Sequence, residues 1–260
     1  MELAADPDYQ GEALAACLDL CVEGRLKVDD LEPQAFSILS FWKAVYEQVK
    51  PMQQTASKLD WLLDEDYSGL RNRAGILLDV MGYLPMEVAE NPLREAFSLT
   101  DPRLKFFAAL SLLRNLRPVE PAELESIAAS HEIRILLWEE LRKMQMESLM
   151  PSRWSTPEML AASEFSRWVS HPMELGAPPE EIEPMGTFAV STSTGRADVY
   201  LFRFREYPKP WEDGAGWMAG IAGPIRDGEF TGSSWSSFDR WNSMAPEEHF
   251  AKLHRISSRC

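Results

Sequence analysis

The spacing of hydrophobic residues changes along this 260-residue chain. As far as about residue 170, apolar side chains recur every three or four positions, which is the period of one helix face. After residue 186 they alternate with polar ones, as at Tyr200, Phe202 and Phe204, which is the period of a strand. The pattern predicts an α+β fold that is predominantly α: antiparallel helical hairpins, followed by a small antiparallel β-sheet module with a terminal helix.

The helical period delimits a series of helices in the first part of the chain. Proline supports several of their starts, because its fixed φ suits the first helical position, as at Pro33, at Pro121 and at Pro157 after the N-cap Thr156. Pro51 is expected to end the second helix, since proline disrupts a helix interior. The expected helices span residues 9–23, 33–49, 55–63, 86–99, 121–129 and 158–169.

Three segments of this helical part share a pattern. Each begins with an N-capping residue (Asp66, Asp101 or Ser130) and continues with an aliphatic–basic pair and an apolar stripe at helical spacing. The aliphatic residues of successive pairs lie 34 and 29 residues apart. They are Leu70, Leu104 and Ile133.

These segments resemble HEAT-type helical repeats, in which the second helix of each pair carries an Asp…Val/Leu-Arg/Lys…Ala pattern. The resemblance covers residues 66–144. Two copies match it well, whereas the third lacks the Asp and has Leu137 in place of the Ala. The resemblance implies an α-solenoid of stacked helical hairpins whose curved surface commonly binds proteins, and it implies no particular activity.

Composition places the domain boundary after the helices. Residues 171–185 include a Pro-rich acidic stretch and are expected to be a connector between a helical-repeat domain, 1–170, and a small β-containing module with a C-terminal helix, 186–260. In the module, Ser243 is expected to cap the terminal helix. A hairpin with Gly195 in its turn is expected to open the sheet, whose strands are predicted at residues 187–190, 199–205, 217–222 and 234–238.

The formal charge of −15 is concentrated at the beginning of the chain. Residues 1–66 contain 14 acidic and 5 basic side chains, a net charge of −9. An acidic field repels phosphate backbones and anionic lipid, so we expect no nucleic-acid and no membrane partner, and a basic protein as the favoured one. The alternative is that acidity only keeps a cytoplasmic protein soluble.

The cysteines and the first residues favour a cytoplasmic location. Three cysteines are too few, and odd in number, for a disulfide framework. Cys17 and Cys21, one helical turn apart, are expected to be buried free thiols rather than a zinc site, and Cys260 stands alone. The start of the chain lacks the features of a signal peptide, and no apolar run reaches the about 18 residues of a membrane span.

Motifs for catalysis, cofactors or metals are not found in the sequence. The glycine cluster at residues 214–224 fits neither a dinucleotide nor a phosphate-loop pattern, and we interpret it as close backbone approach or a bulge within a sheet. The serine cluster at 232–237 lacks the G-x-S-x-G of a nucleophile elbow. None of the four histidines has metal-ligand spacing, and we expect each at the surface. We therefore expect no catalytic residue, no cofactor and no metal.

Aromatic residues of the C-terminal module make a candidate recognition surface. Four of the nine tryptophans fall within 31 residues there. Large aromatics fill the cores of small modules and also dominate recognition patches, so both roles stay open. The candidate surface consists of Tyr200, Phe202, Arg203, Arg205, Trp211, Trp217, Trp235 and Trp241.

Two functions from different classes follow. The first is a non-enzymatic protein–protein interaction module, for example an acidic immunity-type or regulatory protein that binds a basic partner. The alternative is a ligand-binding or catalytic protein with its site in the Trp- and Gly-rich C-terminal module, which predicts a deep pocket within residues 186–245. The missing motifs favour the first function, and they leave the partner and the oligomeric state open.

Overall fold

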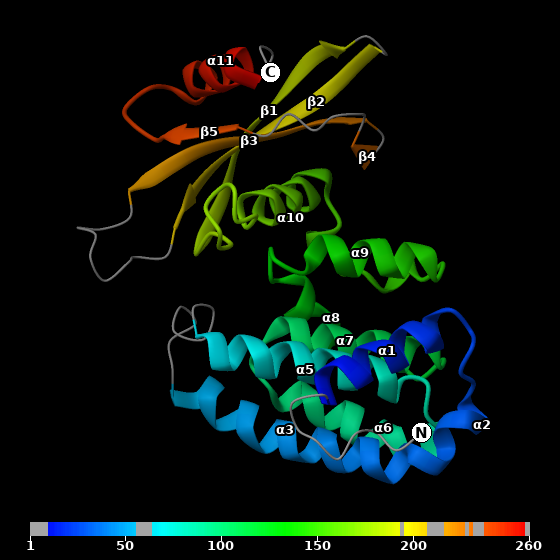
Figure 1. Cartoon of the computed structure of the whole chain (residues 1–260). Coiled ribbons are helices and arrows are strands. Elements are labelled where there is room, and N and C mark those ends of the chain that lie inside the picture. The colour runs from blue at the N-terminus through cyan, green and yellow to red at the C-terminus, as the bar shows by residue number, and fades with distance from the viewer. Residues whose placement is uncertain are drawn as a thin grey trace. The chain divides into compact units, whose positions relative to one another are not determined.

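The computed structural model describes residues 10–55, 64–192, 195–206, 216–226, 229–230 and 237–257. It divides the chain into two compact units. The first extends to Ile127 and includes Glu140–Leu149, and the second consists of Ala128–Glu139 and the chain from Met150 onward. The first unit is helical and the second combines helices with an antiparallel sheet (Figure 1), so the prediction of an α+β, predominantly helical protein with a terminal helix is confirmed.

Eight helices lie within the described part of the first unit or cross its limits. Two further 3-10 segments, η1 (Glu32–Gln34) and η2 (Ala96–Ser98), continue neighbouring helices, and a third, η3 (Glu147–Leu149), follows the last one. The helices are α1 (Gln10–Val22), α2 (Val28–Leu31), α3 (Ala35–Thr55), α5 (Glu65–Met81), α6 (Met86–Glu95), α7 (Pro102–Arg114), α8 (Pro121–Ala128) and α9 (Arg134–Lys143).

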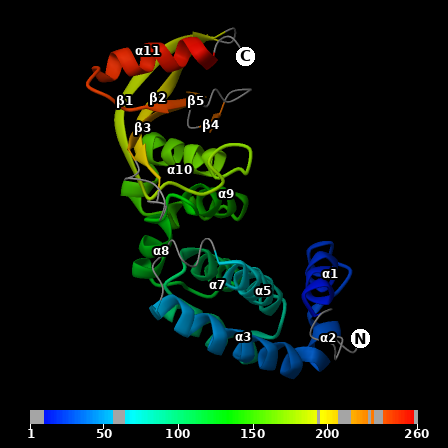
Figure 2. The ribbon, with the colours of Figure 1, turned by 60° about the vertical axis from the view of Figure 1, so that its left-hand side comes forward.

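Helix α5 is the centre of the first unit. It packs against α1, α3 and α7, and Figure 2 shows these helices around it. Its inward face carries Ala74, Leu77 and Leu78, all without exposed surface, at the helical spacing that the sequence predicts.

Helix α3 does not end where the sequence predicts. It continues past Pro51 to Thr55, so the expectation that Pro51 stops the helix is wrong. The buried side chain of Gln53, in the extra turn, accepts hydrogen bonds from the backbone N–H and the hydroxyl of Thr100 at 2.6 and 2.9 Å. These contacts offset the hydrogen bond that proline removes from the helix. Most of the next predicted helix, 55–63, lies outside the described residues.

The N-caps of the repeated segments differ from the prediction at two of three places. Asp101 caps α7 by accepting from the N–H of Arg103 at 2.9 Å, as predicted. Helix α5 is capped by Asp64 and not by Asp66, because Asp64 precedes the first helical residue and accepts from two backbone N–H groups. In the third copy, α9 begins only at Arg134, and the buried hydroxyl of Ser130 has no partner among the described residues.

The second unit places one sheet between two helices (Figure 1). The sheet order is β1-β2-β3-β4, all antiparallel, with β5 also pairing with β3. The predicted β1–β2 hairpin is confirmed, with Thr192 opposite Gly195 at its end. The elements are η4 (Ser152–Trp154), α10 (Pro157–Val169), β1 (Glu181–Thr192), β2 (Gly195–Arg205), β3 (Trp217–Arg226), β4 (Glu229–Phe230), β5 (Ser237–Arg240) and α11 (Pro246–Ser257).

Each face of the sheet packs against one of the two helices. Tyr200, Phe202 and Phe204 project from β2 onto α10 and surround Phe165. The intervening residues of β2 face the opposite side, where Val199 and Leu201 pack with α11. The alternation of β2 is thus the one that the sequence predicts.

The compact units differ from the expected domain limits at 170 and 186. Helix α10 shares a core with the sheet, and residues 181–185 of the expected connector belong to β1. The N-cap of α10 is Thr156, as predicted, through a bond from the N–H of Met159. At the terminal helix the cap is not Ser243: α11 begins at Pro246, and Glu248 accepts from the N–H of Ala245 at 3.1 Å.

Two glycines of the predicted cluster have the roles that the sequence indicates. A Cβ at Gly220 would lie 2.2 Å from the ring of Phe165, so the helix approaches the strand closely there. Gly223 has a φ of +141° and stands where the β2–β3 register shifts, which is a bulge. The interpretation of the cluster as close approach and bulge is confirmed at these positions.

We expect Gly220→Ala to lower the free energy of unfolding by about 1–3 kcal/mol, the cost of overpacking a close-packed core. The added methyl group meets a ring that has no exposed surface and is held by two neighbouring phenylalanines. The measurement is urea denaturation followed by circular dichroism. Gly216→Ala is the matched control, because a Cβ there meets nothing within 4 Å. Equal stability of the two variants would contradict the packing described here.

Candidate functional site

The structure separates the residues of the predicted recognition surface. Tyr200 and Phe202 are buried at 5% and 0% exposure in the core beneath α10, which answers the core-or-surface question for these two. Arg203 and Arg205 lie on the other face of β2, together with the half-buried rings of Trp217 and Trp241. The two remaining members, Trp211 and Trp235, lie outside the described residues.

Arg203, Arg205, Trp217 and Trp241 form a ladder in which guanidinium groups lie over indole rings. The guanidinium of Arg203 lies 4.2 Å from the ring centre of Trp217 and 6.0 Å from that of Trp241. Trp241 also stacks on His249, with the ring centres 4.3 Å apart and an angle of 13° between the ring planes. Cations over aromatic faces are stabilised by the ring quadrupole, so these contacts hold together side chains of β2, β3, the residue that follows β5, and α11.

The positive charges of the ladder are balanced by acids of the preceding strand. Glu183 lies opposite Arg203 in the β1–β2 register and accepts from its Nε at 3.1 Å. Arg205 is paired in the same way with Glu181, and also with Glu180 at 3.2 Å. The arginines are therefore committed to cross-strand ion pairs, and the surface offers no uncompensated positive charge at these positions.

We expect a double-mutant cycle on Glu183→Gln and Arg203→Gln to give a coupling energy of about 0.2–1 kcal/mol, the range of exposed cross-strand pairs. Both side chains are about one third to one half exposed, which keeps the value small. Denaturation of the two single variants, the double variant and the parent protein gives the coupling. A coupling indistinguishable from zero would contradict the commitment of Arg203 to Glu183.

One of the four histidines is buried, which corrects the expectation that all lie at the surface. His249 is 1% exposed, because it stacks on Trp241 and its Nε2 faces the backbone N–H of Asn242 at 3.4 Å. His131 is half-buried and its Nε2 lies 2.8 Å from the carbonyl oxygen of Pro179. Among the described residues, no group of three or more His, Cys, Asp and Glu side chains is arranged to hold a metal ion.

The prediction of buried free thiols is confirmed at Cys17 and Cys21, which are 1% and 4% exposed. Burial raises the pKa of both, that of Cys21 to about 12 with a further contribution from Cys17. Both groups are protonated at neutral pH, so neither is a reactive nucleophile. Cys260 lies outside the described residues, as do residues 232–236 of the serine cluster.

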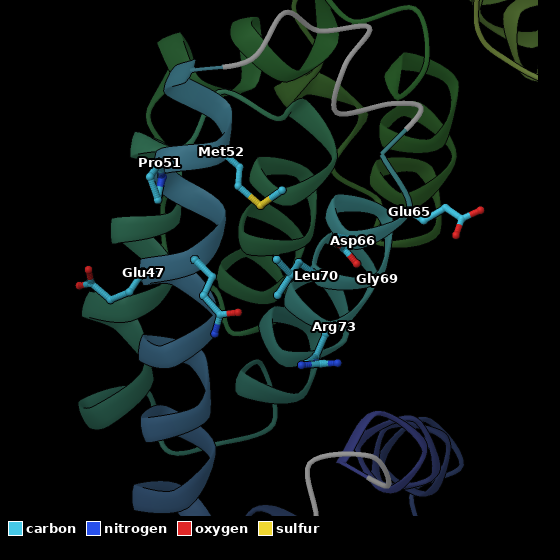
Figure 3. A pocket seen from close by; sticks show the side chains of 9 residues that line it. Glu47, Pro51, Met52, Glu65, Asp66, Gly69, Leu70 and Arg73 are labelled. Atoms are coloured by element: carbon cyan, nitrogen blue, oxygen red, sulfur yellow. The ribbon is translucent and has the colours of Figure 1, made fainter.

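A groove of about 750 Å³ runs between α3 and α5 in the first unit. Sequence reasoning did not find it. The apolar side chains of Met52 and Leu70 point into the space between the helices, whereas Glu47 and Glu65 stand at its margins (Figure 3). Leu70, the aliphatic member of the first predicted aliphatic–basic pair, is only half-buried and forms, with Met52, the apolar floor of the groove. The lining consists of Glu47, Gln48, Pro51, Met52, Glu65, Asp66, Gly69, Leu70 and Arg73.

The two helices that form the groove are tied together by a buried polar network. Gln53 of α3 donates to the hydroxyl of Tyr67 of α5 at 2.9 Å, and that hydroxyl donates to Asp101 at 2.7 Å. Arg71 of α5 also binds Asp101, with its Nε and Nη2 at 2.6 and 3.0 Å from the two carboxylate oxygens. Burial and the neighbouring Asp101 raise the pKa of Tyr67, so it stays protonated and keeps donating.

We expect Asp101→Ala to destabilise the protein by about 3–5 kcal/mol, the cost of removing one partner of a buried ion pair. Asp101 has no exposed surface, and its loss removes one acceptor each from Tyr67 and Arg71, and the cap from α7. Tyr67→Phe removes a single bond from the network and is expected to cost about 1–2 kcal/mol. Both are measured by urea denaturation. A cost for Asp101→Ala no larger than that of the exposed Asp29→Ala would contradict this view.

Comparison with known proteins assigns no family to the chain. The chain matches no protein-family model, no curated protein and no solved structure. No helix in the described ranges combines the length and apolar character that crossing a membrane requires.

Proposed function

We propose that the chain is a non-enzymatic protein–protein interaction module whose helical unit binds a basic protein partner. The observation that carries the proposal is the set of exposed acids without an ion-pair partner at the beginning of the described chain. All ten acidic residues described between residues 10 and 66 are exposed. Within the described chain, Glu23 alone among them is ion-paired, with Arg25; the other nine are Glu12, Asp19, Asp29, Asp30, Glu32, Glu47, Asp64, Glu65 and Asp66.

Many acids further along the chain are ion-paired, unlike the nine just named. Asp79 pairs with Arg114 at 2.6 Å, and Glu90 pairs with both Arg94 and Arg117. The acids of β1 are matched to arginines of β2, as described above. An excess of unpaired negative charge on one part of a protein steers and holds a partner of opposite charge, and it repels polyanions.

A HEAT-like interpretation of residues 66–144 is part of the same proposal. Support comes from the packing of the helices in pairs, α3 with α5 and α6 with α7, combined with lateral contacts of α5 with α7 and of α3 with α6. Stacking of like helices in successive hairpins is the arrangement that helical repeats use. Solenoids of this kind present extended binding surfaces, which agrees with a binding role.

An immunity-type or regulatory protein in the cytoplasm is one concrete form of such a module, and it rests on charge alone. The alternative, a ligand or catalytic site in the C-terminal module, has less support. Two of its aromatic residues are in the core, and Arg203 and Arg205 are paired with acids.

We expect the tagged full-length chain to retain a stoichiometric protein partner of high isoelectric point from a lysate of the source cells at low salt. Neutralising six of the unpaired acids weakens capture by tenfold or more, since each exposed charge contributes a part of the attraction. The binding variant carries E12Q, D19N, D29N, E32Q, E65Q and D66N.

A matched control carries six neutralised acids from elsewhere on the exposed surface and is expected to capture the partner as the parent does. The control residues are Glu87, Glu120, Glu147, Glu158, Glu174 and Glu247, each changed to Gln. Quantitative mass spectrometry of the eluates gives the ratio. Recovery of no stoichiometric partner at low and moderate salt, or equal loss in both variants, would contradict the proposal.

A further inference from the structure

We infer that the groove between α3 and α5 is the docking site for an amphipathic helix of the basic partner, which seats one long apolar side chain between Met52 and Leu70 and presents Lys or Arg to the surrounding carboxylates. The inference rests on the proposed function and adds to it the site and the kind of segment that is bound.

The shape of the groove points to a helix. Its lining residues recur with the helical period on both walls, at 47, 48, 51 and 52 of α3 and at 65, 66, 69, 70 and 73 of α5. On α5 this row covers nine residues, which is about 12 Å at about 1.5 Å per residue. A third helix that lies in the furrow between two packed helices makes the same ridge-and-groove contacts as helices in a core.

The floor of the groove provides the apolar contact. Met52 and Leu70 are half-buried and face each other across it (Figure 3). A Cβ built at Gly69 meets no atom within 4 Å, so the space above that residue is open. Methionine adapts to differently shaped partners, and it is frequent in grooves that receive helices.

The charges around the floor select a basic segment. Glu47, Glu65 and Asp66 are exposed, and no Lys or Arg of the described chain is ion-paired with them. Arg73 is the one basic residue of the lining and belongs to the end of the row farthest from Glu65. A bound helix is therefore expected to place its basic residues near the first turn of α5 and to tolerate an acidic residue near Arg73.

The polar network links the two helices that form the walls of the groove. Gln53 and Tyr67 adjoin Met52 and Asp66 in sequence, and their mutual hydrogen bond fixes α3 against α5. A preformed groove loses little conformational entropy when a partner binds.

The test uses synthetic 18-residue helical peptides and the full-length protein. The first peptide carries leucines along one face and lysines on the other; a second has glutamates for the lysines, and a third has alanines for the leucines. Binding is measured by calorimetry at low salt and by the ¹³C-methyl resonance of Met52, assigned with Met52→Leu. We expect the first peptide to bind saturably and to shift this resonance, and the other two to bind at least tenfold more weakly.

Two variants test the site itself. Gly69→Leu fills the groove and favours helix formation, so it is expected to weaken binding of the first peptide at least tenfold without destabilising the protein. Glu65→Gln with Asp66→Asn is expected to weaken it about tenfold through loss of charge. The controls are Gly11→Leu, at another open helical glycine, and Glu12→Gln with Asp19→Asn; neither is expected to change the affinity more than threefold.

The outcomes distinguish failure of the groove as the docking site from failure of the proposed function. An unshifted Met52 resonance, or equal weakening by groove and control variants, would overturn the groove as the docking site. If a basic partner is captured from lysate and binds the Gly69→Leu variant as tightly as the parent, the groove is excluded and the proposed function stands. If neither a partner nor the first peptide binds, both are contradicted.

Discussion

The carboxylate of Asp101 is buried without exposed surface, and a buried charge is tolerated only when its surroundings satisfy it. Here the hydroxyl of Tyr67, the guanidinium of Arg71 and the backbone of α7 all converge on it. Gln53 extends the network to α3. Three helices are therefore locked in one relative position by a single group, and the groove between α3 and α5 exists because of that position.

Charge is distributed in opposite ways in the sheet and at the beginning of the helical unit. In the sheet, acids of β1 meet arginines of β2 in register, and Trp217 covers the guanidinium of Arg203, so the surface is complementary to itself. In the helical unit, the ten acids described between residues 10 and 66 are exposed, and only Glu23 is ion-paired within the described chain. Self-repulsion of this kind lowers the stability of an isolated protein, and a partner of opposite charge relieves it. For this reason the proposed binding role is assigned to the helical unit.

Local patterns predicted much of the fold, and long-range contacts account for the differences. The alternation in β2, the Thr156–Pro157 start of α10 and the close approach at Gly220 depend on neighbours in sequence or on a missing side chain, and each was predictable. The continuation of α3 past Pro51 depends on Gln53 and Thr100, which lie 47 residues apart. Burial of His249 depends on Trp241, and division of the aromatics between core and surface depends on which helix covers each sheet face. The groove forms only where α3 and α5 pack together, so no single segment of the sequence predicts it.

The central claim is that a basic partner binds the helical unit along α3 and α5. Hydrogen–deuterium exchange of the full-length chain, alone and with the captured partner, tests this most directly. The claim predicts that slowed exchange is concentrated in peptides covering residues 44–55 and 64–75. Slowed exchange confined to β1, β2 and β3, with α3 and α5 unchanged, would contradict it and place the binding surface on the sheet.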